Sequence, residues 1–282
     1  MQLRIMCNNI WWCDENSPQW KEQGHDCSAA VRSVGLLRLY RETNPDIIGL
    51  QECSAQMTAE LMIHIVNDRL PYTMLWGKDT PILYRKDKLE LLDSDVCIYP
   101  EEIPGIEGSF NNLSTKSYCI GIFRVKENGK VFIFATTHLW WKSSDPDAQH
   151  YQPYSDEARA YQLNLLLDKV EKYCSKYNCP AVVVGDMNAV YDSVAVQSAL
   201  NRGYSHGHDV ATEYADESQG MHYCYADGFD TLPASGGFLK AIDHILVKNM
   251  PNGAVARFER YSPRYYMPLS DHFPVWIDVI ID

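Results

Sequence analysis

The sequence lacks the features that mark membrane spans and cysteine-based metal or redox sites. Its 282 residues contain no uninterrupted apolar run of the roughly 18 residues needed to cross a bilayer. None of the nine cysteines forms a CxxC pair, which argues against a zinc ribbon or a thioredoxin-like motif. Several, such as Cys7 and Cys119, lie in apolar runs, where a free thiol behaves as a small hydrophobic residue. This distribution of cysteines favours a protein that resides in a reducing compartment.

The N-terminal stretch MQLRIMCNNIWW has neither the long apolar segment nor the small-residue cleavage site of a signal peptide. It is typical of a first β-strand. Together with the cysteines it leads us to expect a cytoplasmic location, although a chain from which a signal peptide had been removed would look the same.

Positive charge is scarce. The 25 lysines and arginines are outnumbered by 37 acidic residues, and the formal net charge is −12. Proteins that grip long duplex DNA present a basic surface to its phosphates, and the basic clusters here are short, such as Arg85–Lys88. We therefore expect no strong duplex binding. A phosphorylated small molecule or a single-stranded nucleic acid remains compatible, because a divalent cation can supply positive charge.

No internal repeat, low-complexity segment or linker divides the chain, so residues 1–282 are expected to form one domain, and a monomer. Helical periodicity over 28–43 places Val31, Val34, Leu37 and Leu39–Tyr40 on one face. A turn at Glu127–Gly129 predicts a hairpin, and residues 201–240 read as a long irregular connection. Strands are expected at 3–10, 46–50, 82–84, 96–99, 118–125, 131–138, 181–184, 241–247 and 275–281, and helices at 28–43, 54–70, 155–177 and 193–200. This pattern indicates an α/β (α+β) fold with helices outside a mixed sheet.

Several predicted strands end in groups that bind metal or phosphate. The residues at such ends are Asn9, Glu52, His138, Asp186 with Asn188, Asp243, and Asp271 with His272. A single polar strand end is usually a turn, but side chains at corresponding strand ends converge on one edge of an α/β sheet. Carboxylates gathered there repel one another unless a cation lies between them. Oxygen ligands select a hard ion, so the sequence predicts Mg²⁺, or Mn²⁺, rather than zinc.

The ordered series CNNI, IIGLQE, TTHL, VVVGDMNA, AIDHILV and PLSDHFPV resembles the endonuclease/exonuclease/phosphatase superfamily, which includes DNase I, sphingomyelinases, inositol polyphosphate 5-phosphatases and deadenylases. The resemblance runs from residue 3 to residue 281. It implies a DNase I-like fold, a four-layer sandwich of two packed mixed β-sheets flanked by helices. Position 8 is a departure from the family pattern, because several branches of the family carry an aromatic or other residue where this chain has Asn8.

The resemblance also implies roles for the site residues. Glu52 is the principal metal ligand, with Asn9 and Asp271 at or near the ion. Asp186 and Asn188 orient the attacking water and contact the phosphate. His272 is oriented by Asp243, which fixes its tautomer and raises its basicity.

His138 is implied to bind phosphate or to protonate the leaving oxygen, as in the DNase I-like, sphingomyelinase-like and deadenylase-like branches. Lys116 stands where relatives often carry a basic residue that faces the site. His222 is a further substrate-binding candidate. His206 and His208, with His222, fit no metal-ligand spacing, and the pairs Trp11–Trp12 and Trp140–Trp141 are candidates either for stacking on substrate or for packing beneath the loops.

These residues predict a Mg²⁺-dependent hydrolase of phosphoester bonds that acts by in-line attack of water on a small, sugar, lipid-headgroup or single-stranded substrate. Whether Asp186 or His272 takes the proton is open, as is the preference for diesters or monoesters. An endo- or exonuclease acting on DNA or RNA is the main alternative. A dinuclear metallophosphatase would need DxH and GNH motifs, which are missing. A binding module without catalysis would not need the complete set of catalytic matches.

Overall fold

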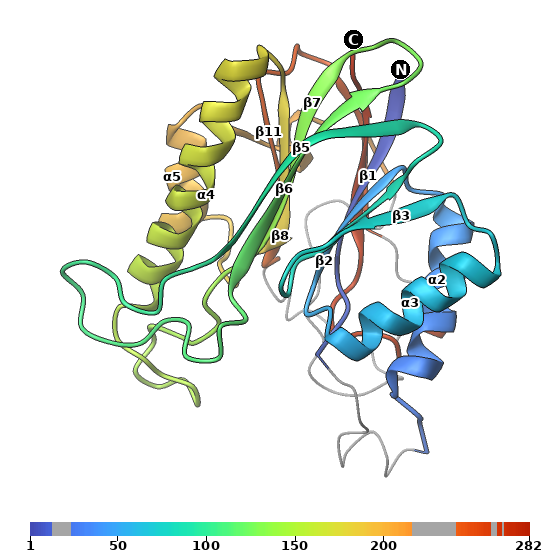
Figure 1. Cartoon of the computed structure of the whole chain (residues 1–282). Coiled ribbons are helices and arrows are strands. Elements are labelled where there is room, and N and C mark those ends of the chain that lie inside the picture. The colour runs from blue at the N-terminus through green and yellow to red at the C-terminus, as the bar shows by residue number, and fades with distance from the viewer. Residues whose placement is uncertain (13–23, 216–240, 261–263, 267) are drawn as a thin grey trace.

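Two mixed β-sheets pack face to face, and helices cover the outer face of each (Figure 1). The computed structural model describes residues 1–12, 24–215, 241–260, 264–266 and 268–282. The four layers expected from the sequence are confirmed. The seven-stranded sheet has the order β10 (Glu213–Tyr214), β12 (Val255–Arg260), β13 (Val275–Ile280), β1 (Gln2–Asn9), β2 (Ile47–Gln51), β4 (Ile82–Arg85), β3 (Tyr72–Leu75).

The second sheet has six strands. Its order is β5 (Leu89–Ile98), β6 (Ser117–Val125), β7 (Val131–His138), β8 (Ala181–Asp186), β11 (Asp243–Lys248), β9 (Ser205–His206). Helices α2 (Ala29–Thr43) and α3 (Ala55–Asn67) pack on the seven-stranded sheet, and α4 (Ser155–Tyr177) and α5 (Val194–Asn201) pack on this one. Two short elements, α6 (Gly207–Val210) and the 3-10 turn Arg264–Tyr266, complete the description. Within the described ranges, no helix combines the length and the apolar character that a membrane span requires.

The central layer is an apolar core between the two sheets. Alternate residues of each strand point into it, among them Ile5, Phe134 and Ile277. The sheets approach each other closely at Gly49 of β2, where a Cβ atom would lie 2.5 Å from a methyl carbon of Val184 on β8. Only glycine fits there, which explains the glycine in the IIGLQE stretch.

The expected helices are confirmed, and their ends have identifiable causes. The Ser54 hydroxyl accepts the Met57 N–H at 3.0 Å to begin α3, and Ser193 accepts the Val196 N–H at 3.2 Å to begin α5. Asn44 caps the C-terminus of helix α2 in a left-handed conformation, with φ of +50°, and Pro45 follows it.

The apolar face predicted for α2 was partly wrong. Leu37, Leu39 and Tyr40 are buried, but Val31 and Val34 are 48% and 51% exposed. The polar Arg32 and Ser33 take the buried positions instead, and Arg32 uses its position to bind loop carbonyls near the candidate site.

Three strand predictions also need correction. β5 begins at Leu89 rather than Val96, and β3 and β12 were not predicted at all. β5 carries exposed polar residues, β3 has four residues, and β12 interrupts its apolar residues with Arg257, Glu259 and Arg260. β5 and β3 are also edge strands whose outer side pairs with no other strand of their sheet. The hairpin around Glu127–Gly129 joins β6 to β7 as predicted. Of the connection over 201–240, the described part contains β9, α6 and β10.

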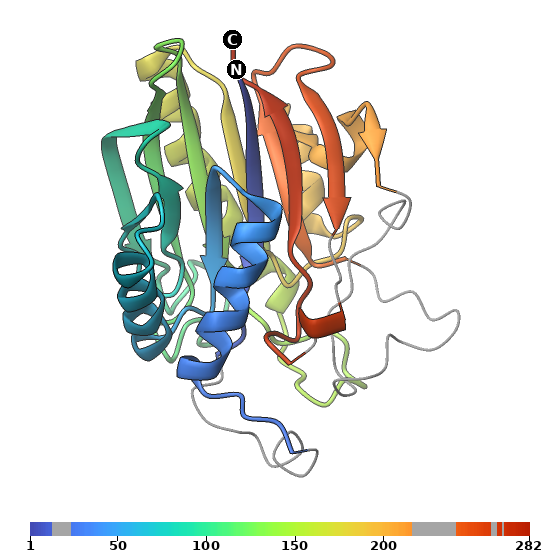
Figure 2. The ribbon, with the colours of Figure 1, turned by 90° about the vertical axis from the view of Figure 1, so that its right-hand side faces the viewer.

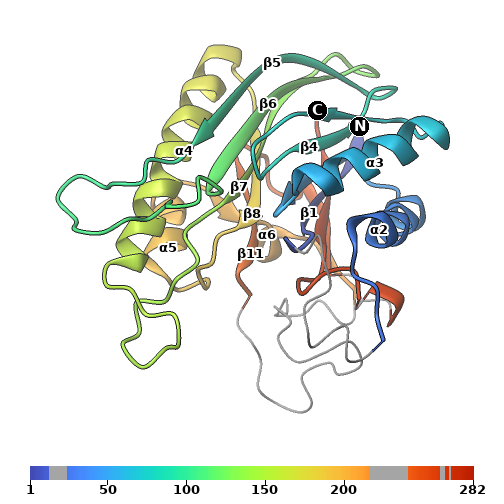
Figure 3. The same cartoon turned by 60° about the horizontal axis from the view of Figure 1, so that its bottom comes forward.

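Two parallel strand pairs bring the polar strand ends together. β1 runs parallel to β2, with Asn9 beside Gln51, and β7 runs parallel to β8, with His138 beside Asp186. The two pairs belong to different sheets and meet at the same end of the sandwich, which Figure 3 turns toward the viewer. Figure 2 shows β1, in dark blue, between its neighbours in the seven-stranded sheet, with the red β13 beside it.

Candidate active site

The carboxylate of Asp186 lies at the centre of the converging side chains. Its Oδ2 accepts a hydrogen bond from Asn9 Nδ2 at 2.9 Å, which links the two sheets directly. Its Oδ1 accepts the backbone N–H of Asn188 at 2.9 Å. Two imidazole nitrogens face the same Oδ2, His138 Nε2 at 3.5 Å and His272 Nε2 at 3.8 Å. The residues expected from strands far apart in the sequence are therefore brought together.

His272 and Asp243 form the pair predicted from the sequence. His272 Nδ1 lies 2.7 Å from Asp243 Oδ2, so the ring donates from Nδ1 and turns Nε2 toward Asp186. Burial raises the pKa of Asp243, and the positive charge of His272 works against that rise. Both side chains are almost completely buried, which fixes the orientation of the imidazole.

His138 has an equivalent partner that the sequence reasoning missed. Its Nδ1 lies 2.6 Å from Oδ2 of Asp79, a buried residue in the loop between β3 and β4. Asp79 follows a strand that was itself not predicted, so it stood in no recognised strand-end pattern. The one available signal was the short segment GKDTP, which places an acidic residue directly before the predicted strand over 82–84.

Lys116 is buried against His138. Its Nζ lies 2.6 Å from His138 Nε2. Because an ammonium group can only donate, this contact places the His138 proton on Nδ1, toward Asp79. Burial lowers the pKa of Lys116, while the negative charges of Glu52, Asp79 and Asp186 hold it up. The prediction that Lys116 faces the site is consistent with this geometry.

Glu52 is held from two sides. Its Oε2 accepts the backbone N–H of Trp12 at 2.6 Å, and Asn9 Nδ2 lies 3.3 Å from its Oε1. Burial alone would raise the pKa of Glu52, but the charges of His138, Lys116 and His272 bring it below its ordinary value. The same balance holds at Asp186, where His272 and His138 outweigh burial and lower its pKa.

The chain bends sharply at both Glu52 and Asn188. Their φ angles are +58° and +47°, a left-handed conformation that side chains other than glycine adopt at an energetic cost. Asn188 Nδ2 donates to the Leu139 carbonyl at 3.1 Å, which ties it to the loop after His138. Gly185 allows β8 to lie this close to β7, since a Cβ there would be 2.3 Å from the Thr137 carbonyl oxygen.

A second layer of hydrogen bonds orients the residues around Asn9. The Ser270 hydroxyl donates to the Asn9 carbonyl at 2.7 Å and accepts the His272 N–H at 3.1 Å. Asn8, the position that departs from several branches, points away from the site and bonds the hydroxyls of Tyr266 and Tyr40 at 2.6 and 3.0 Å. Asn8 is thus part of the support of the site.

The donor set fits a divalent cation. Glu52, His138 and Asp186 each offer one ligand atom within 4.8 Å of the others, and so do Asp186, Asp243 and His272. Among the described residues, the buried Oδ1 atoms of Asp79, Asp243 and Asp271 have no hydrogen-bond partner. A buried carboxylate oxygen without a hydrogen-bond partner is energetically costly, and a cation bound nearby would offset that cost.

Asp271 belongs to neither of these ligand groups, although it lies close enough for its charge to act on them. Burial raises its pKa to about 7, and the negative charge of Glu52 adds to this, while His272 opposes it. A carboxyl group in this condition loses its proton readily when a cation arrives.

The remaining candidates divide between the described and undescribed parts of the chain. His222 lies outside the described residues. His206 is buried at 2.9 Å from His244 Nδ1, and His244 Nε2 lies 2.7 Å from the Ala189 carbonyl oxygen. Burial, together with His244 and His208, keeps the pKa of His206 well below its ordinary value. These rings therefore form a neutral hydrogen-bonded chain next to the loop that carries Asn188.

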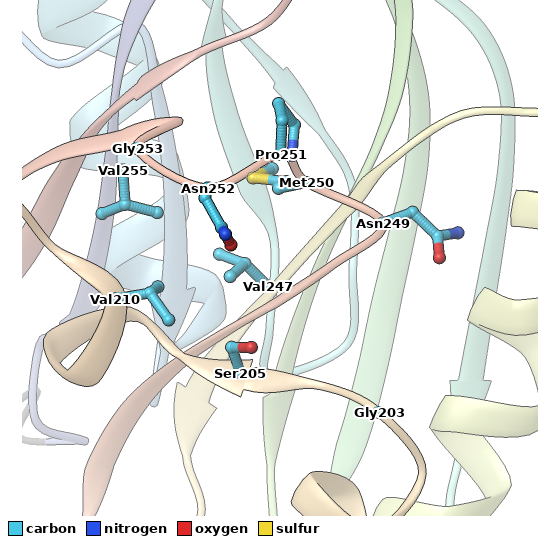
Figure 4. A pocket seen from close by; sticks show the side chains of 10 residues that line it. All are labelled: Gly203, Ser205, Val210, Val247, Asn249, Met250, Pro251, Asn252, Gly253 and Val255. Atoms are coloured by element: carbon cyan, nitrogen blue, oxygen red, sulfur yellow. The ribbon is translucent and has the colours of Figure 1, made fainter.

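A pocket of about 270 Å³ lies between the 249–253 turn and the β9–α6 segment (Figure 4). The turn follows Lys248, at the end of β11 opposite to Asp243. None of the ten side chains that line the pocket is ionisable, and those drawn there include Ser205, Val247 and Asn252. The pocket is thus separate from the converging carboxylates, and its chemistry does not suit a phosphate group.

Comparison with known proteins agrees with this geometry. The model of the Endonuclease/Exonuclease/phosphatase family matches residues 9–272. The CCR4-Not complex 3'-5'-exoribonuclease subunit Ccr4 of Candida albicans is 26% identical over 144 residues. That match covers 45% of this chain and 17% of Ccr4, so the chain spans less than a fifth of that protein's length.

Solved structures show the same fold. The mannosyl-6-phosphatase Bt3783 of Bacteroides thetaiotaomicron superposes with a TM-score of 0.74 at 18% identity, with 99% of each chain covered. The D. rerio TDP2 complexed with single strand DNA product gives 0.67 at 17% identity, with 98% of each chain covered. With the family match over residues 9–272 and a cluster of histidine and acidic residues at one end of the sandwich, the chain belongs to the Endonuclease/Exonuclease/phosphatase family.

Proposed function

We propose that this protein is a Mg²⁺-dependent phosphoesterase that hydrolyses a small phosphorylated molecule by in-line attack of water. The observation that supports this most strongly is the position of Asp186 Oδ2 between two imidazole nitrogens and an asparagine amide. Mn²⁺ is expected to substitute for Mg²⁺, because both are hard ions that prefer oxygen ligands.

Glu52 and Asp186, with Asp271 nearby, would hold the cation, which when bound stabilises negative charge on a phosphoryl oxygen. Asn9, predicted as a ligand, turns its Nδ2 toward both Glu52 and Asp186 and would orient these carboxylates instead. Asp186 and Asn188 would orient the attacking water. The Lys116 ammonium group next to His138 can donate to phosphate oxygens. His138, whose Nδ1 proton is held by Asp79, can donate to the departing oxygen once Nε2 is protonated as well.

His272 is the better candidate for the general base. Both oxygens of Asp186 already accept hydrogen bonds, from the Asn9 side chain and from the Asn188 backbone, which makes its carboxylate a poor proton acceptor. Asp243 holds the His272 proton on Nδ1, so that Nε2 is left with a lone pair facing the site. The 3.8 Å between Nε2 and Asp186 Oδ2 is too long for a hydrogen bond, and Nε2 can instead accept a proton from water.

The charge around the site favours a small substrate over a nucleic acid. The 99–116 and 139–154 loops reach this end of the sandwich and expose five carboxylates, Glu101, Glu102, Glu107, Asp145 and Asp147. Lys142 is the one further cation on these two loops besides Lys116. A polyanion would be repelled by this surface, whereas one phosphate next to the cation would not. The Bacteroides mannosyl-6-phosphatase is consistent with this choice, and the DNA complex of TDP2 keeps the nuclease as the second candidate.

A substrate panel tests the proposal. Hexose phosphates, nucleoside monophosphates, an aryl phosphodiester, sphingomyelin, single-stranded DNA and RNA are incubated with Mg²⁺, with Mn²⁺ and with EDTA. We expect metal-dependent turnover of a small phosphoester that Asp186→Ala and His272→Ala abolish while the circular dichroism spectrum is unchanged. Full turnover in EDTA, or in either variant, would refute the assignment, and cleavage confined to nucleic acids would favour the nuclease.

A further inference from the structure

The site is built from two copies of one structural unit that the sequence does not show as a repeat. In each copy a strand leads through a loop and a helix to a parallel neighbouring strand: β1–α2–β2 in one sheet and β7–α4–β8 in the other. The first residue past each leading strand makes the same bond. The Ile10 N–H donates to the Gln51 carbonyl at 3.0 Å, and the Leu139 N–H donates to the Asp186 carbonyl at 3.1 Å.

Each unit carries a tryptophan pair at the same place, directly after this bond. In the second unit Trp140 is buried, with its ring 6.1 Å from that of Phe110, while Trp141 is 42% exposed. In the first unit Trp11 packs on the apolar layer under α2, while Trp12 is 47% exposed. In each pair the inner tryptophan therefore packs beneath the loops, and the outer tryptophan is exposed and available for stacking on substrate.

A buried arginine from the following helix holds each pair in place. Arg32 of α2 donates to the carbonyls of Ile10, Trp11 at 3.0 Å and Leu269 at 2.8 Å. Arg159 of α4 donates to the carbonyls of Trp140 at 3.1 Å and Lys142 at 2.6 Å. Fixing loop carbonyls in this way gives both outer tryptophans a set position, although neither ring is needed for the core.

In each unit the backbone at the outer tryptophan follows closely on residues of the candidate site. The Trp12 N–H donates to Glu52 Oε2 at 2.6 Å. Trp141 is three residues beyond His138, whose Nε2 is 3.8 Å from Glu52 Oε1. Trp12 follows a strand of one sheet and Trp141 a strand of the other, and the Trp141 ring lies 4.9 Å from that of His150 in the same loop.

We infer that Trp12 and Trp141 form two aromatic walls of a subsite for a ring carried by the phosphoester, either a sugar with an apolar face or a nucleobase. This inference rests on the proposed function and names the substrate class of the same site. Indole rings provide large rigid contact area for such groups at low entropic cost, and stacking of this kind tolerates different rings. The acidic loops around the subsite exclude a long polyanion but not a single ring next to one phosphate.

Kinetics with matched substrates test the inference. Trp12→Ala, Trp141→Ala and the double variant are compared on a hexose 6-phosphate, a nucleoside 5'-monophosphate and glycerol 3-phosphate, which has no ring. We expect each single substitution to raise KM for a ring-bearing substrate by about tenfold, with KM for glycerol 3-phosphate unchanged. Phenylalanine at either position should restore most of the loss. Ile63→Ala, which truncates a 51% exposed apolar side chain on the outside of α3, is the control and should change nothing.

The substrate whose KM rises more in the tryptophan variants identifies the ring that the subsite binds. A sugar subsite predicts the larger rise for the hexose 6-phosphate, and a base subsite predicts it for the nucleoside monophosphate. Equal losses on all three substrates, or no loss on any, would overturn the inference even if metal-dependent turnover is present. Binding gives an answer independent of turnover. Calorimetric titration of Asp186→Asn protein should show tighter binding of a ring-bearing phosphate than of glycerol 3-phosphate, and the tryptophan substitutions should abolish the difference. Equal affinities would refute the subsite, whereas absent turnover in the wild type would refute the proposed function.

Discussion

His138 Nδ1 lies 2.6 Å from Asp79 Oδ2, in the same arrangement as His272 Nδ1 and Asp243 Oδ2 at 2.7 Å. Each histidine thus has its Nδ1 proton held by an aspartate and its Nε2 directed at Asp186. In this tautomer each Nε2 carries a lone pair, so either imidazole can accept a proton at Nε2 and can donate from that atom only after it has been protonated.

Asp79→Asn should lower kcat/KM by about 10²-fold or more, because the amide can present a donor where His138 needs an acceptor and the ring then loses its orientation. The profile of kcat/KM against pH should also shift, which a purely structural role would not cause. Asp87→Asn, at an exposed aspartate paired with Arg85 at 2.7 Å, is the control. An unchanged profile in Asp79→Asn would show that His138 works without this partner.

Lys116→Met should separate metal binding from turnover. The ammonium group lies among carboxylates that hold up its pKa, and it competes with a cation for them. Removing it should tighten Mg²⁺ binding about tenfold, which corresponds to about 1.4 kcal/mol, while kcat falls because a donor to the phosphate is lost. Titration calorimetry and steady-state kinetics measure the two effects. Weaker Mg²⁺ binding in the variant would contradict the charge balance described for the site.

Metal binding should depend on pH through Asp271. Its pKa is raised to about 7 in the folded chain, above the ordinary value of 3.8. The folded, metal-free protein therefore keeps a proton that the unfolded chain releases at lower pH, and the stabilisation associated with that proton is lost as pH rises through about 7. Mg²⁺ must displace the proton below this pH. The increase in Tm that Mg²⁺ gives should accordingly be larger at pH 8 than at pH 6, and Asp271→Asn should remove most of the difference.

Glu52 offers a test of backbone strain. Its φ of +58° disfavours any residue with a Cβ atom, and glycine has no such penalty. Both Glu52→Ala and Glu52→Gly should lose metal binding, but the glycine variant should be more stable than the alanine variant by about 1 kcal/mol. Denaturant unfolding without metal measures the difference. Equal stabilities would mean that the backbone at this position relaxes when the glutamate is removed.

The strands and helices were predictable from local signals, and the site residues from an ordered series of short motifs that resembles one family. Strands such as Val182–Val184 are short apolar runs that end in polar residues, and their order along the chain placed Glu52, Asp186 and His272 together. The four long helices had clear ends, such as Asn44–Pro45 and the serine caps.

The parts that were missed depend on contacts made only in the folded chain. Asp79 has no local pattern, and its role follows from a loop that places it beside His138, 59 residues further on. Arg32 was not singled out from the sequence, and it is buried because loop carbonyls from three segments surround it. β3 was missed and β5 was predicted too short because both are edge strands, and a strand that is paired on one side tolerates polar residues.

The arginine contacts have a consequence for how such a protein can diversify. Arg32 binds the carbonyl of Cys27 at 2.8 Å as well as those of Ile10 and Trp11, so it fastens the chain on both sides of the intervening segment. Changes in the length or composition of that segment need not disturb the ion ligands. Substitutions can therefore accumulate between the two fastened ends while the hydrolytic machinery is inherited unaltered.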